Sequence, residues 1–304
     1  MTQSSNPRLQ RFQRAKVPPN MSLRNRDKVV IQAVHEYRVL STTHIQTLLF
    51  GSRQTAQDRL SKLYHNGYLE RRAIPTLGGA ASSPILYILD NRGAEILRSE
   101  FGMNVRQPKK DKRLGEGFLE HLMDTNTFRV AIAVAARYHG YKVDFWIDDM
   151  ALKDDYDRVD IPTQAGRTRS VPVTPDSYFA LTVPRGTTNF FLELDRDNME
   201  LPRFETKIVT YLHYYASGGY ERRYKTKSLR VLTVVTADTP ARSHSRLAAL
   251  KKTTEDAGGH EVFYFTTLDE VVPSEDEQEE MPEKVLHQPI WRVAGSDELH
   301  PLIE

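Results

Sequence analysis

Two neighbouring apolar segments in the second half of the chain carry carboxylates that could bind a metal ion. Asp176 follows Pro175 at the start of one segment, and Glu193 and Asp195 lie in the next, within FFLELD. Residues i and i+2 of a strand share a face, so Glu193 and Asp195 should point the same way. If the two strands are neighbours in a sheet, three carboxylates converge, and Mg²⁺ or Mn²⁺ prefers such oxygen ligands.

A metal ion at this position would favour chemistry on a phosphodiester. It could polarise the phosphate group and lower the pKa of a bound water. A nearby lysine would stabilise the negative charge that develops during the reaction. The residue types therefore predict a metal-dependent nuclease, provided that the two strands lie side by side.

The surrounding segments alternate between helical and strand periodicity, which predicts a mixed sheet with helices on both faces. We expect a helix at 118–138 and then strands at 141–147, 173–183 and 189–195. A helix from about Pro202 to Tyr215, a strand at 229–236, a helix at 241–257 and a strand at 262–267 follow.

Composition narrows the classes of protein. The absence of cysteine excludes disulfides and zinc sites built from thiolates. No apolar run is long enough to cross a bilayer, and the first thirty residues do not resemble a secretory signal, so we expect a cytoplasmic protein without membrane contact. Residues 1–113 carry 20 Lys+Arg against 8 Asp+Glu, net +12, whereas residues 114–304 carry 22 against 32, net −10. A basic first half suggests a polyanionic partner.

The first half shows the pattern of a small helical domain with a hairpin. Residues 1–24 are basic and aperiodic, so we expect a flexible arm. A helix begins near Arg26, a second begins after Ser41 or Thr42, and a third follows Ser52. Two short strands, 68–72 and 85–89, and a helix at 92–100 complete the unit.

The third helix has the form of a recognition helix. Ala56, Leu60 and Leu63 recur at i, i+4 and i+7 and should be buried. The outward side chains can bind base edges in the major groove, and three further basic residues suit phosphates. The base-reading candidates are Arg53, Gln54, Gln57 and Ser61, and the phosphate candidates are Lys62, Arg71 and Arg72. The block resembles a winged helix-turn-helix domain, which binds double-stranded DNA, although some such domains bind proteins instead.

The second half resembles the PD-(D/E)XK nuclease superfamily, the restriction-endonuclease-like fold, through Pro175, Asp176 and Glu193. One position departs from the motif, because Asp195 stands where lysine is expected. The resemblance implies that the lysine has moved to the next helix, as in some members, and Lys207 is the candidate. It also implies an acidic residue on the first helix, for which Glu120 is the candidate.

Another interpretation of these residues needs no metal. Asp176 and Asp195 could cap turns, while Lys207 pairs with Glu193 at the surface. A nuclease fold that had lost its activity would leave the same residues. Against the simplest form of this view, strands seldom bury two carboxylates without a partner, because an unpaired buried charge is costly.

The whole chain is similar to the replication-relaxation family. We expect a flexible arm at 1–24, a winged helix-turn-helix domain at 25–100, a linker at 101–115, a nuclease-like domain at 116–272, and an acidic tract with a C-terminal tail at 273–304. The resemblance implies a plasmid or mobile-element protein that acts in replication, relaxation or transfer, either as a Mg²⁺- or Mn²⁺-dependent DNA endonuclease or as a non-catalytic regulator or replication accessory factor. A homodimer and other replication or transfer proteins are the further partners that we expect.

Overall fold

The computed structural model describes residues 11–74, 83–105, 114–162, 166–272 and 281–303. The chain forms two compact units, Met1–Val130 and Ala131–Glu304. Several predicted features lie wholly or partly outside the described residues: the start of the basic arm, most of the TLGGAASSP loop, the centre of the linker and most of the acidic tract.

The N-terminal unit contains the predicted helices and hairpin. Its elements are α1 (Asn25–Tyr37), β1 (Val39–Ser41), α2 (Thr42–Leu49), α3 (Arg53–His65), β2 (Leu69–Arg72), β3 (Leu86–Leu89), α4 (Asn91–Phe101) and the first part of α6 (Glu116–Tyr138). The side chains of Ser41 and Ser52 cap α2 and α3, as predicted. The strands form an antiparallel sheet of order β1-β3-β2, in which β1 was not predicted.

The core of the N-terminal unit includes the first part of α6. Leu119 and Leu122 of this helix pack with Val39 of β1 and with Leu86 and Ile88 of β3. The unit therefore extends beyond the predicted linker, to Val130 within α6. On α3, the predicted apolar stripe of Ala56, Leu60 and Leu63 is fully buried.

The basic arm is held against the unit from Arg14 onward, which corrects the expectation of a flexible segment for these residues. Arg14 forms ion pairs with Glu70 at 3.1 Å and Asp90 at 2.5 Å. The backbone N–H of Ala15 donates to His65 at 3.0 Å. These ion pairs and this hydrogen bond hold the segment in place, although its sequence shows no hydrophobic periodicity.

The C-terminal unit is built on a mixed seven-stranded sheet, which confirms the predicted α/β class. The strand order is β12-β11-β10-β9-β8-β7-β4. β8–β9 and β9–β10 are parallel pairs, and the other pairs are antiparallel. The strands of the sheet are β4 (Lys142–Asp148), β7 (Ser177–Val183), β8 (Gly186–Asp195), β9 (Arg230–Val235), β10 (Phe263–Thr267), β11 (Trp291–Val293) and β12 (Leu299–His300).

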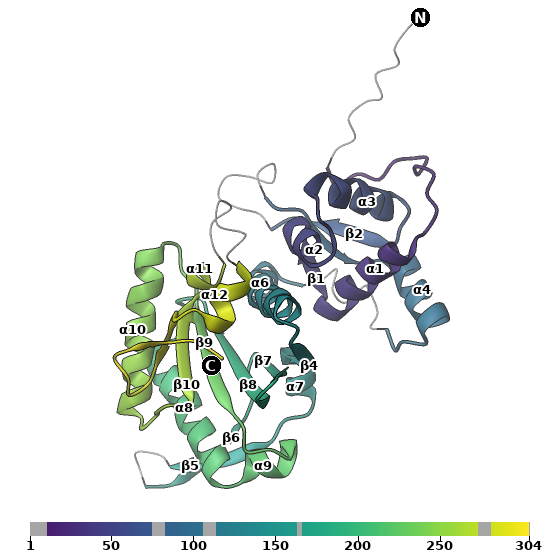
Figure 1. Ribbon diagram of the computed structural model, residues 1–304. Helices are drawn as coiled ribbons and strands as arrows, with labels where there is room; N and C mark the ends of the chain where they lie inside the picture. Colours follow the sequence, from purple (N-terminus) through teal and green to yellow (C-terminus); the bar gives the residue numbers. More distant parts are fainter. Residues whose placement is uncertain (1–10, 75–82, 106–113, 163–165, 273–280, 304) are drawn as a thin grey trace, which may run out of the picture. The chain divides into compact units, whose positions relative to one another are not determined.

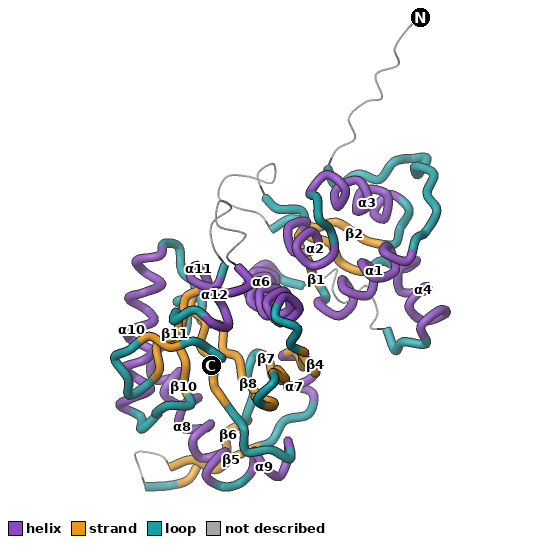
Figure 2. The backbone as a smooth tube through the Cα atoms, in the orientation of Figure 1, coloured by secondary structure: helices purple, strands orange, loops and turns teal. Residues whose placement is uncertain are grey.

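Two helices lie on one side of this sheet, α8 (Leu201–Ala216) and α10 (Pro240–Asp256) (Figures 1 and 2). Phe191, Val231 and Phe265 of the sheet pack with Ile208 and Leu250 of these helices in one cluster. Side chains on the opposite face of the strands, such as Phe190 and Leu192, are also buried, so both faces of the sheet are covered.

Four shorter elements and a hairpin were not predicted. These are α7 (Asp149–Asp154), α9 (Gly219–Tyr224), α11 (Leu268–Val271), α12 (Met281–His287) and the separate two-stranded sheet of β5 (Arg158–Pro162) and β6 (Thr168–Pro172). The hairpin lies next to α9, and β5 packs on α8 (Figure 1).

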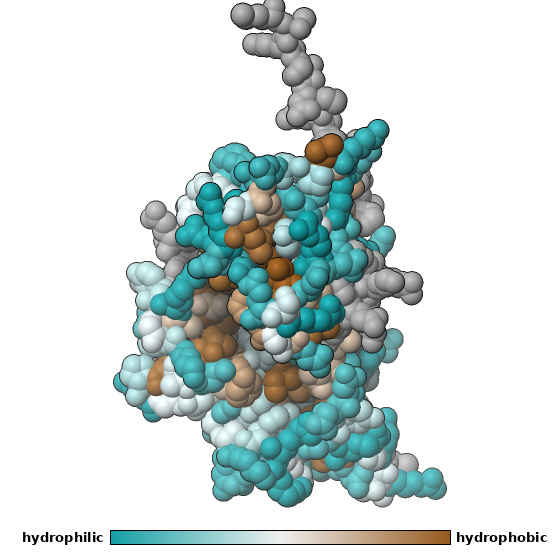
Figure 3. All heavy atoms as spheres, turned by 90° about the vertical axis from the view of Figure 1, so that its right-hand side faces the viewer, coloured by the Kyte–Doolittle hydropathy of each residue, from teal (hydrophilic) through white to brown (hydrophobic). Residues whose placement is uncertain are grey.

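Among the described residues, no helix has the length and apolar character that a bilayer-spanning segment needs. The molecular face in Figure 3 is mainly hydrophilic.

The chain beyond residue 281 is part of the fold, which corrects its description as a tail. β11 pairs with β10, and β12 pairs with β11. Leu286 and Trp291 are fully buried, and the indole N–H of Trp291 donates to the backbone oxygen of Val285 at 3.0 Å. The domain predicted at 116–272 therefore does not end at residue 272, because these segments extend its sheet and core.

Candidate functional site

The antiparallel register of β7 and β8 brings Asp176 opposite Glu193. Ser177 pairs with Leu192, so Asp176, one residue earlier, lies beside the next residue of β8. The backbone N–H of Asp176 donates to Leu192 at 2.9 Å, and its carboxylate accepts from the N–H of Leu194 at 2.9 Å. The strand adjacency on which the sequence prediction depended is therefore confirmed.

Helix α8 supplies two more members of this cluster, of which Lys207 was a predicted site residue. The ammonium of Lys207 donates to one carboxylate oxygen of Glu193, and the hydroxyl of Tyr211 donates to the other. The two residues are one helical turn apart, so both can face the same point of the sheet. Glu193 is 3% exposed and the Lys207 side chain is 23% exposed. The ion pair is thus largely buried, not a surface contact.

Burial and neighbouring charges shift the pKa values of this cluster. Burial raises the pKa of the Glu193 carboxyl; Lys207 opposes the shift and Asp176 adds to it. Burial disfavours the charged form of Lys207, but the carboxylates of Glu193 and Asp176 outweigh burial and raise its pKa. Burial, with the Glu193 carboxylate, also raises the pKa of the Tyr211 hydroxyl. Lys207 therefore keeps its positive charge, and Tyr211 keeps the proton that it donates.

Asp195 is bound to a different cation, which corrects the expected convergence of three carboxylates. Arg246 of α10 donates to both oxygens of Asp195, each at 2.8 Å. Asp195 is 3% exposed, and its oxygen also accepts from the N–H of Asp197 at 2.9 Å. Glu193 and Asp195 are separated by about 6.6 Å of strand rise, so each can pair with a different helix. In the part of the chain that the structure describes, no three His, Asp or Glu residues form a group that could hold a metal ion.

The sequence predicted some of the other residues near this cluster and missed others. Arg203 shares the α8 face and is close enough to Lys207 to lower its pKa, against the larger opposite effects. Arg246 was missed, since no local pattern connects it with Asp195. Tyr211 was not among the predicted site residues, although its spacing of four residues from Lys207 places it on the same helix face. Glu120 lies on the part of α6 that belongs to the N-terminal unit, and its catalytic role stays a prediction.

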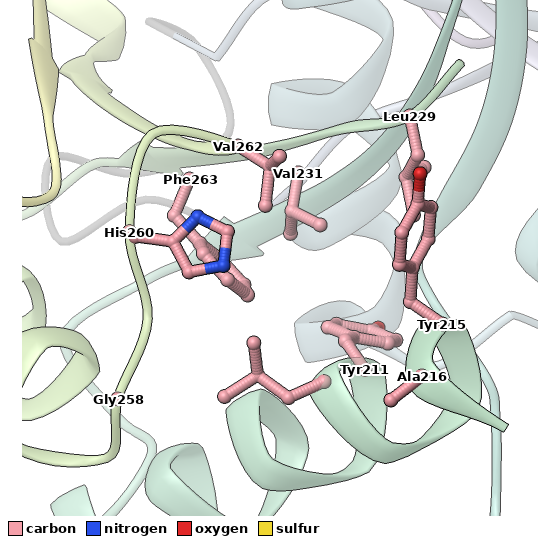
Figure 4. A pocket seen from close by; sticks show the side chains of 10 residues that line it. Tyr211, Tyr215, Ala216, Leu229, Val231, Gly258, His260, Val262 and Phe263 are labelled. Carbon is pink, nitrogen blue, oxygen red and sulfur yellow. The ribbon is translucent and has the colours of Figure 1, made fainter. Parts of the chain in front are cut away.

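The ring of Tyr211 also lines an apolar cavity of about 360 Å³ (Figure 4). Val231 and Phe263 of the sheet contribute apolar walls, and the rings of Tyr215 and His260 are also part of the lining shown there. Tyr211 thus has two roles: its hydroxyl orients Glu193, and its ring forms a wall of the cavity. A change in the ring position would therefore also move the hydrogen bond to Glu193.

In the N-terminal unit, the outward face of α3 has the exposure expected of a recognition helix. Arg53, Gln54 and Gln57 are exposed, whereas Ser61 and Lys62 are partly buried. The amide of Gln54 donates to Asp58 at 2.9 Å, so an acidic side chain also lies on this face. The sequence analysis did not consider Asp58, whose negative charge weakens the attraction of this face for phosphates.

The two arginines at the base of the predicted wing make contacts within the protein. The Arg71 guanidinium lies over the rings of Tyr64 at 4.4 Å and Tyr87 at 5.6 Å, and it donates to the backbone oxygen of Arg11 at 3.1 Å. Arg72 donates to the backbone oxygen of Leu114 at 3.0 Å. Both guanidiniums are therefore partly used to hold the unit together, and their assignment to phosphates stays a prediction.

Of three comparisons with known proteins, one identifies the family of this chain. No curated protein matches the chain. The structure of the restriction endonuclease FokI is similar over 80% of this chain and 42% of that chain, with 11% identity and a TM-score of 0.28. The chain thus spans less than half of that structure. A similarity at this level assigns neither a fold nor a function to the chain. Residues 31–229 match the profile of the family described as Replication-relaxation. Because this match covers more than half of the sequence, the chain belongs to the replication-relaxation family.

Proposed function

We propose that this chain binds DNA and that its C-terminal unit cleaves a phosphodiester bond with the help of a divalent metal ion. The observation that carries the proposal is the meeting of Asp176, Glu193 and Lys207, which come from three separate segments. Two carboxylates beside a protonated lysine combine oxygen ligands with a fixed positive charge. Hydrolysis of a phosphodiester needs both, because negative charge builds up on the phosphate in the transition state.

The carboxylates of Asp176 and Glu193 are a pair of oxygen ligands of the kind that binds Mg²⁺ or Mn²⁺. Mg²⁺ is commonly bound by one or two carboxylates, with waters and substrate phosphate oxygens completing its coordination. Asp176 and Glu193 would be those carboxylates, and the bound ion would polarise the phosphate and activate a water. Lys207 would exchange part of its contact with Glu193 for the substrate phosphate. Tyr211 would keep the Glu193 carboxylate in a fixed orientation throughout.

The N-terminal unit is the proposed DNA reader. Its order of helices and hairpin and the exposed Arg53, Gln54 and Gln57 support insertion of α3 into the major groove. The net charge of +12 in residues 1–113 supports contact with phosphates. In this proposal the protein serves replication, relaxation or transfer of a plasmid or another mobile element.

A second candidate function is a non-catalytic regulator or accessory factor with the same fold. One observation favours it: Glu193 and Asp195 already have cationic partners, in Lys207 and Arg246, and both carboxylates are almost fully buried. A closed network of this kind could also stabilise a unit that has lost its activity. The two candidates predict different results in a cleavage assay.

The test is nicking of supercoiled plasmid by the full-length chain, with Mg²⁺ or Mn²⁺ and with a chelator. We expect metal-dependent nicking that Asp176→Asn reduces by a factor of 10² or more, on the order expected for losing a metal ligand. The matched control is Asp160→Asn, which makes the same change at an exposed position of β5. Mn²⁺ binding measured by calorimetry should weaken in Asp176→Asn and stay unchanged in the control.

The outcomes separate the two functions. Equal nicking by wild type and Asp176→Asn would overturn the assignment of the catalytic site. DNA binding without nicking in either metal, by a correctly folded wild-type chain, would favour the non-catalytic regulator. Absence of DNA binding would remove both candidates.

A further inference from the structure

One cavity of the C-terminal unit has a lining rich in arginine, although residues 114–304 as a whole carry a net charge of −10. Arg158 of β5 and Arg222 and Arg223 of α9 line an open cavity of about 470 Å³. These elements lie at the lower end of the unit in Figure 1, and the same end in Figure 3 is strongly hydrophilic. Three guanidiniums around one cavity favour an anionic ligand.

Arg223 of this group binds carboxylates of the protein itself. It pairs with Asp155 at 3.0 Å and with Asp157 at 3.1 Å. The hydroxyl of Tyr214 donates to the other oxygen of Asp157. The acidic side chain that lines the cavity is therefore already bound to a cation and a hydroxyl, so it repels an incoming anion less than a free carboxylate would.

Arg158 and Arg222 have charges that remain uncompensated. Arg158 donates to the side chain and backbone oxygens of Ser170, at 3.1 and 2.7 Å, and Arg222 donates to the backbone oxygen of Ser217 at 2.8 Å. These acceptors are neutral, and each guanidinium has five N–H groups, so donors remain. Both side chains are exposed, and neither forms an ion pair within the described residues.

We propose that Arg158 and Arg222 form a subsite for a backbone phosphate of the DNA strand that the C-terminal unit acts on. Guanidinium groups bind phosphate oxygens through charge-assisted hydrogen bonds, often two at a time. This inference rests on the proposed function, because it assumes that the unit engages DNA.

The position of the cavity relative to the proposed catalytic cluster supports a shared substrate strand. Lys207 and Tyr214 both lie on α8, seven residues apart, which corresponds to about 10 Å along the helix axis. One DNA strand carries a phosphate every 3.4 Å or so of axial rise, so a few nucleotides of one strand can span this distance. β6 ends at Pro172, shortly before Asp176, so the hairpin at the cavity leads directly into the cluster.

The first test is the binding of a labelled 20-base-pair duplex to the full-length chain, in a chelator, across a range of salt concentrations. Arg158→Gln/Arg222→Gln should weaken binding about tenfold. It should also reduce the slope of log K against log salt by roughly 0.9 for each lost phosphate contact. The control, Arg169→Gln/Arg185→Gln, removes the same charge from two exposed positions outside the cavity and should change binding much less.

The second test works on the wild-type chain and does not depend on the folding of variants. Phenylglyoxal modification followed by mass spectrometry should show that the duplex protects Arg158 and Arg222 but not Arg169. Equal protection by inorganic phosphate, at the concentration of the DNA phosphates, would overturn the assignment to a strand.

The two proposals fail in different ways. Wild-type DNA binding that both double variants weaken equally, without protection of Arg158 and Arg222, would overturn this inference alone. A wild-type chain that does not bind DNA would overturn the proposed function together with this subsite.

Discussion

Replacement of Lys207 by methionine tests whether the ion pair with Glu193 is truly buried. Methionine keeps much of the volume of the lysine stem but removes the charge, which leaves the 3%-exposed Glu193 carboxylate with the Tyr211 hydroxyl as a hydrogen-bond donor. Breaking a buried pair by removing one partner costs about 3–5 kcal/mol. The nearby carboxylate of Asp176 adds repulsion. We therefore expect the free energy of unfolding of the C-terminal unit to fall by about that amount.

The protein contains its own probe for this measurement. Its two tryptophans, Trp146 and Trp291, both lie in the C-terminal unit. Tryptophan fluorescence during urea denaturation, recorded in a chelator, therefore reports the unfolding of that unit separately from the N-terminal one. The charge-neutral double variant Lys207→Met/Glu193→Gln should regain most of the lost stability, because no unpaired charge then remains buried.

Two results would refute this reasoning. A loss below about 1 kcal/mol in Lys207→Met would be typical of a solvent-exposed pair and would contradict the burial of Glu193. A double variant that is no more stable than Lys207→Met would show that lost packing, not the unpaired charge, causes the destabilisation.

Two further predictions concern other parts of the chain. Burial lowers the pKa of His44 to about 4. As the pH falls below about 6.5, the unfolded chain therefore binds a proton at His44 before the folded chain does. The stability of the N-terminal unit should decrease by about 3 kcal/mol between pH 7 and 4 as a result. Calorimetry should show a smaller decrease in His44→Phe but not in His260→Gln, and equal decreases would contradict this assignment. Leu286 is fully buried and Leu299 is 49% exposed, so Leu286→Ala should lower the stability of the C-terminal unit to urea by about 2–5 kcal/mol. The Leu299→Ala control should cost less than about 0.5 kcal/mol, and equal losses would contradict the packing of α12.

Much of the cluster of Asp176, Glu193 and Lys207 could be predicted, because its signals are local or belong to a known motif. Strand alternation placed Glu193 and Asp195 on one face of β8. Lys207 and Tyr211, which are four residues apart, share one face of α8. The pairing of β7 with β8 was a natural assumption for strands that are consecutive in sequence. These rules brought Asp176 and Glu193 together, and the resemblance to the PD-(D/E)XK superfamily supplied Lys207 on the following helix.

The partner of Asp195 could not be predicted in the same way. Arg246 lies 51 residues further along the chain, in a helix whose sequence contains several other cations. Which cation reaches Asp195 depends on how α10 is placed on the sheet, and sequence periodicity does not contain that placement. The wrong prediction of three converging carboxylates came from treating a shared strand face as a shared site.

Short elements and aperiodic segments were the other failures. β11 has three residues and β12 has two, which is too short for an alternating pattern to be recognised. The contacts of Arg14 with Glu70 and Asp90 span more than fifty residues, so a basic segment without periodicity was mistaken for a flexible one. In both cases the stabilising partners are distant in sequence.

The addition of β11 and β12 to the sheet has a consequence for synthesis. During translation these strands leave the ribosome after every other strand of the seven-stranded sheet, and the N-terminal unit leaves before all of them. The N-terminal unit could therefore reach its native state, and meet its ligand, on a nascent chain whose C-terminal unit still lacks an edge and part of its core. Completion of the unit that holds Asp176 and Glu193 would then follow the folding of the N-terminal unit, so ligand binding by the N-terminal unit could precede any reaction at Asp176 and Glu193.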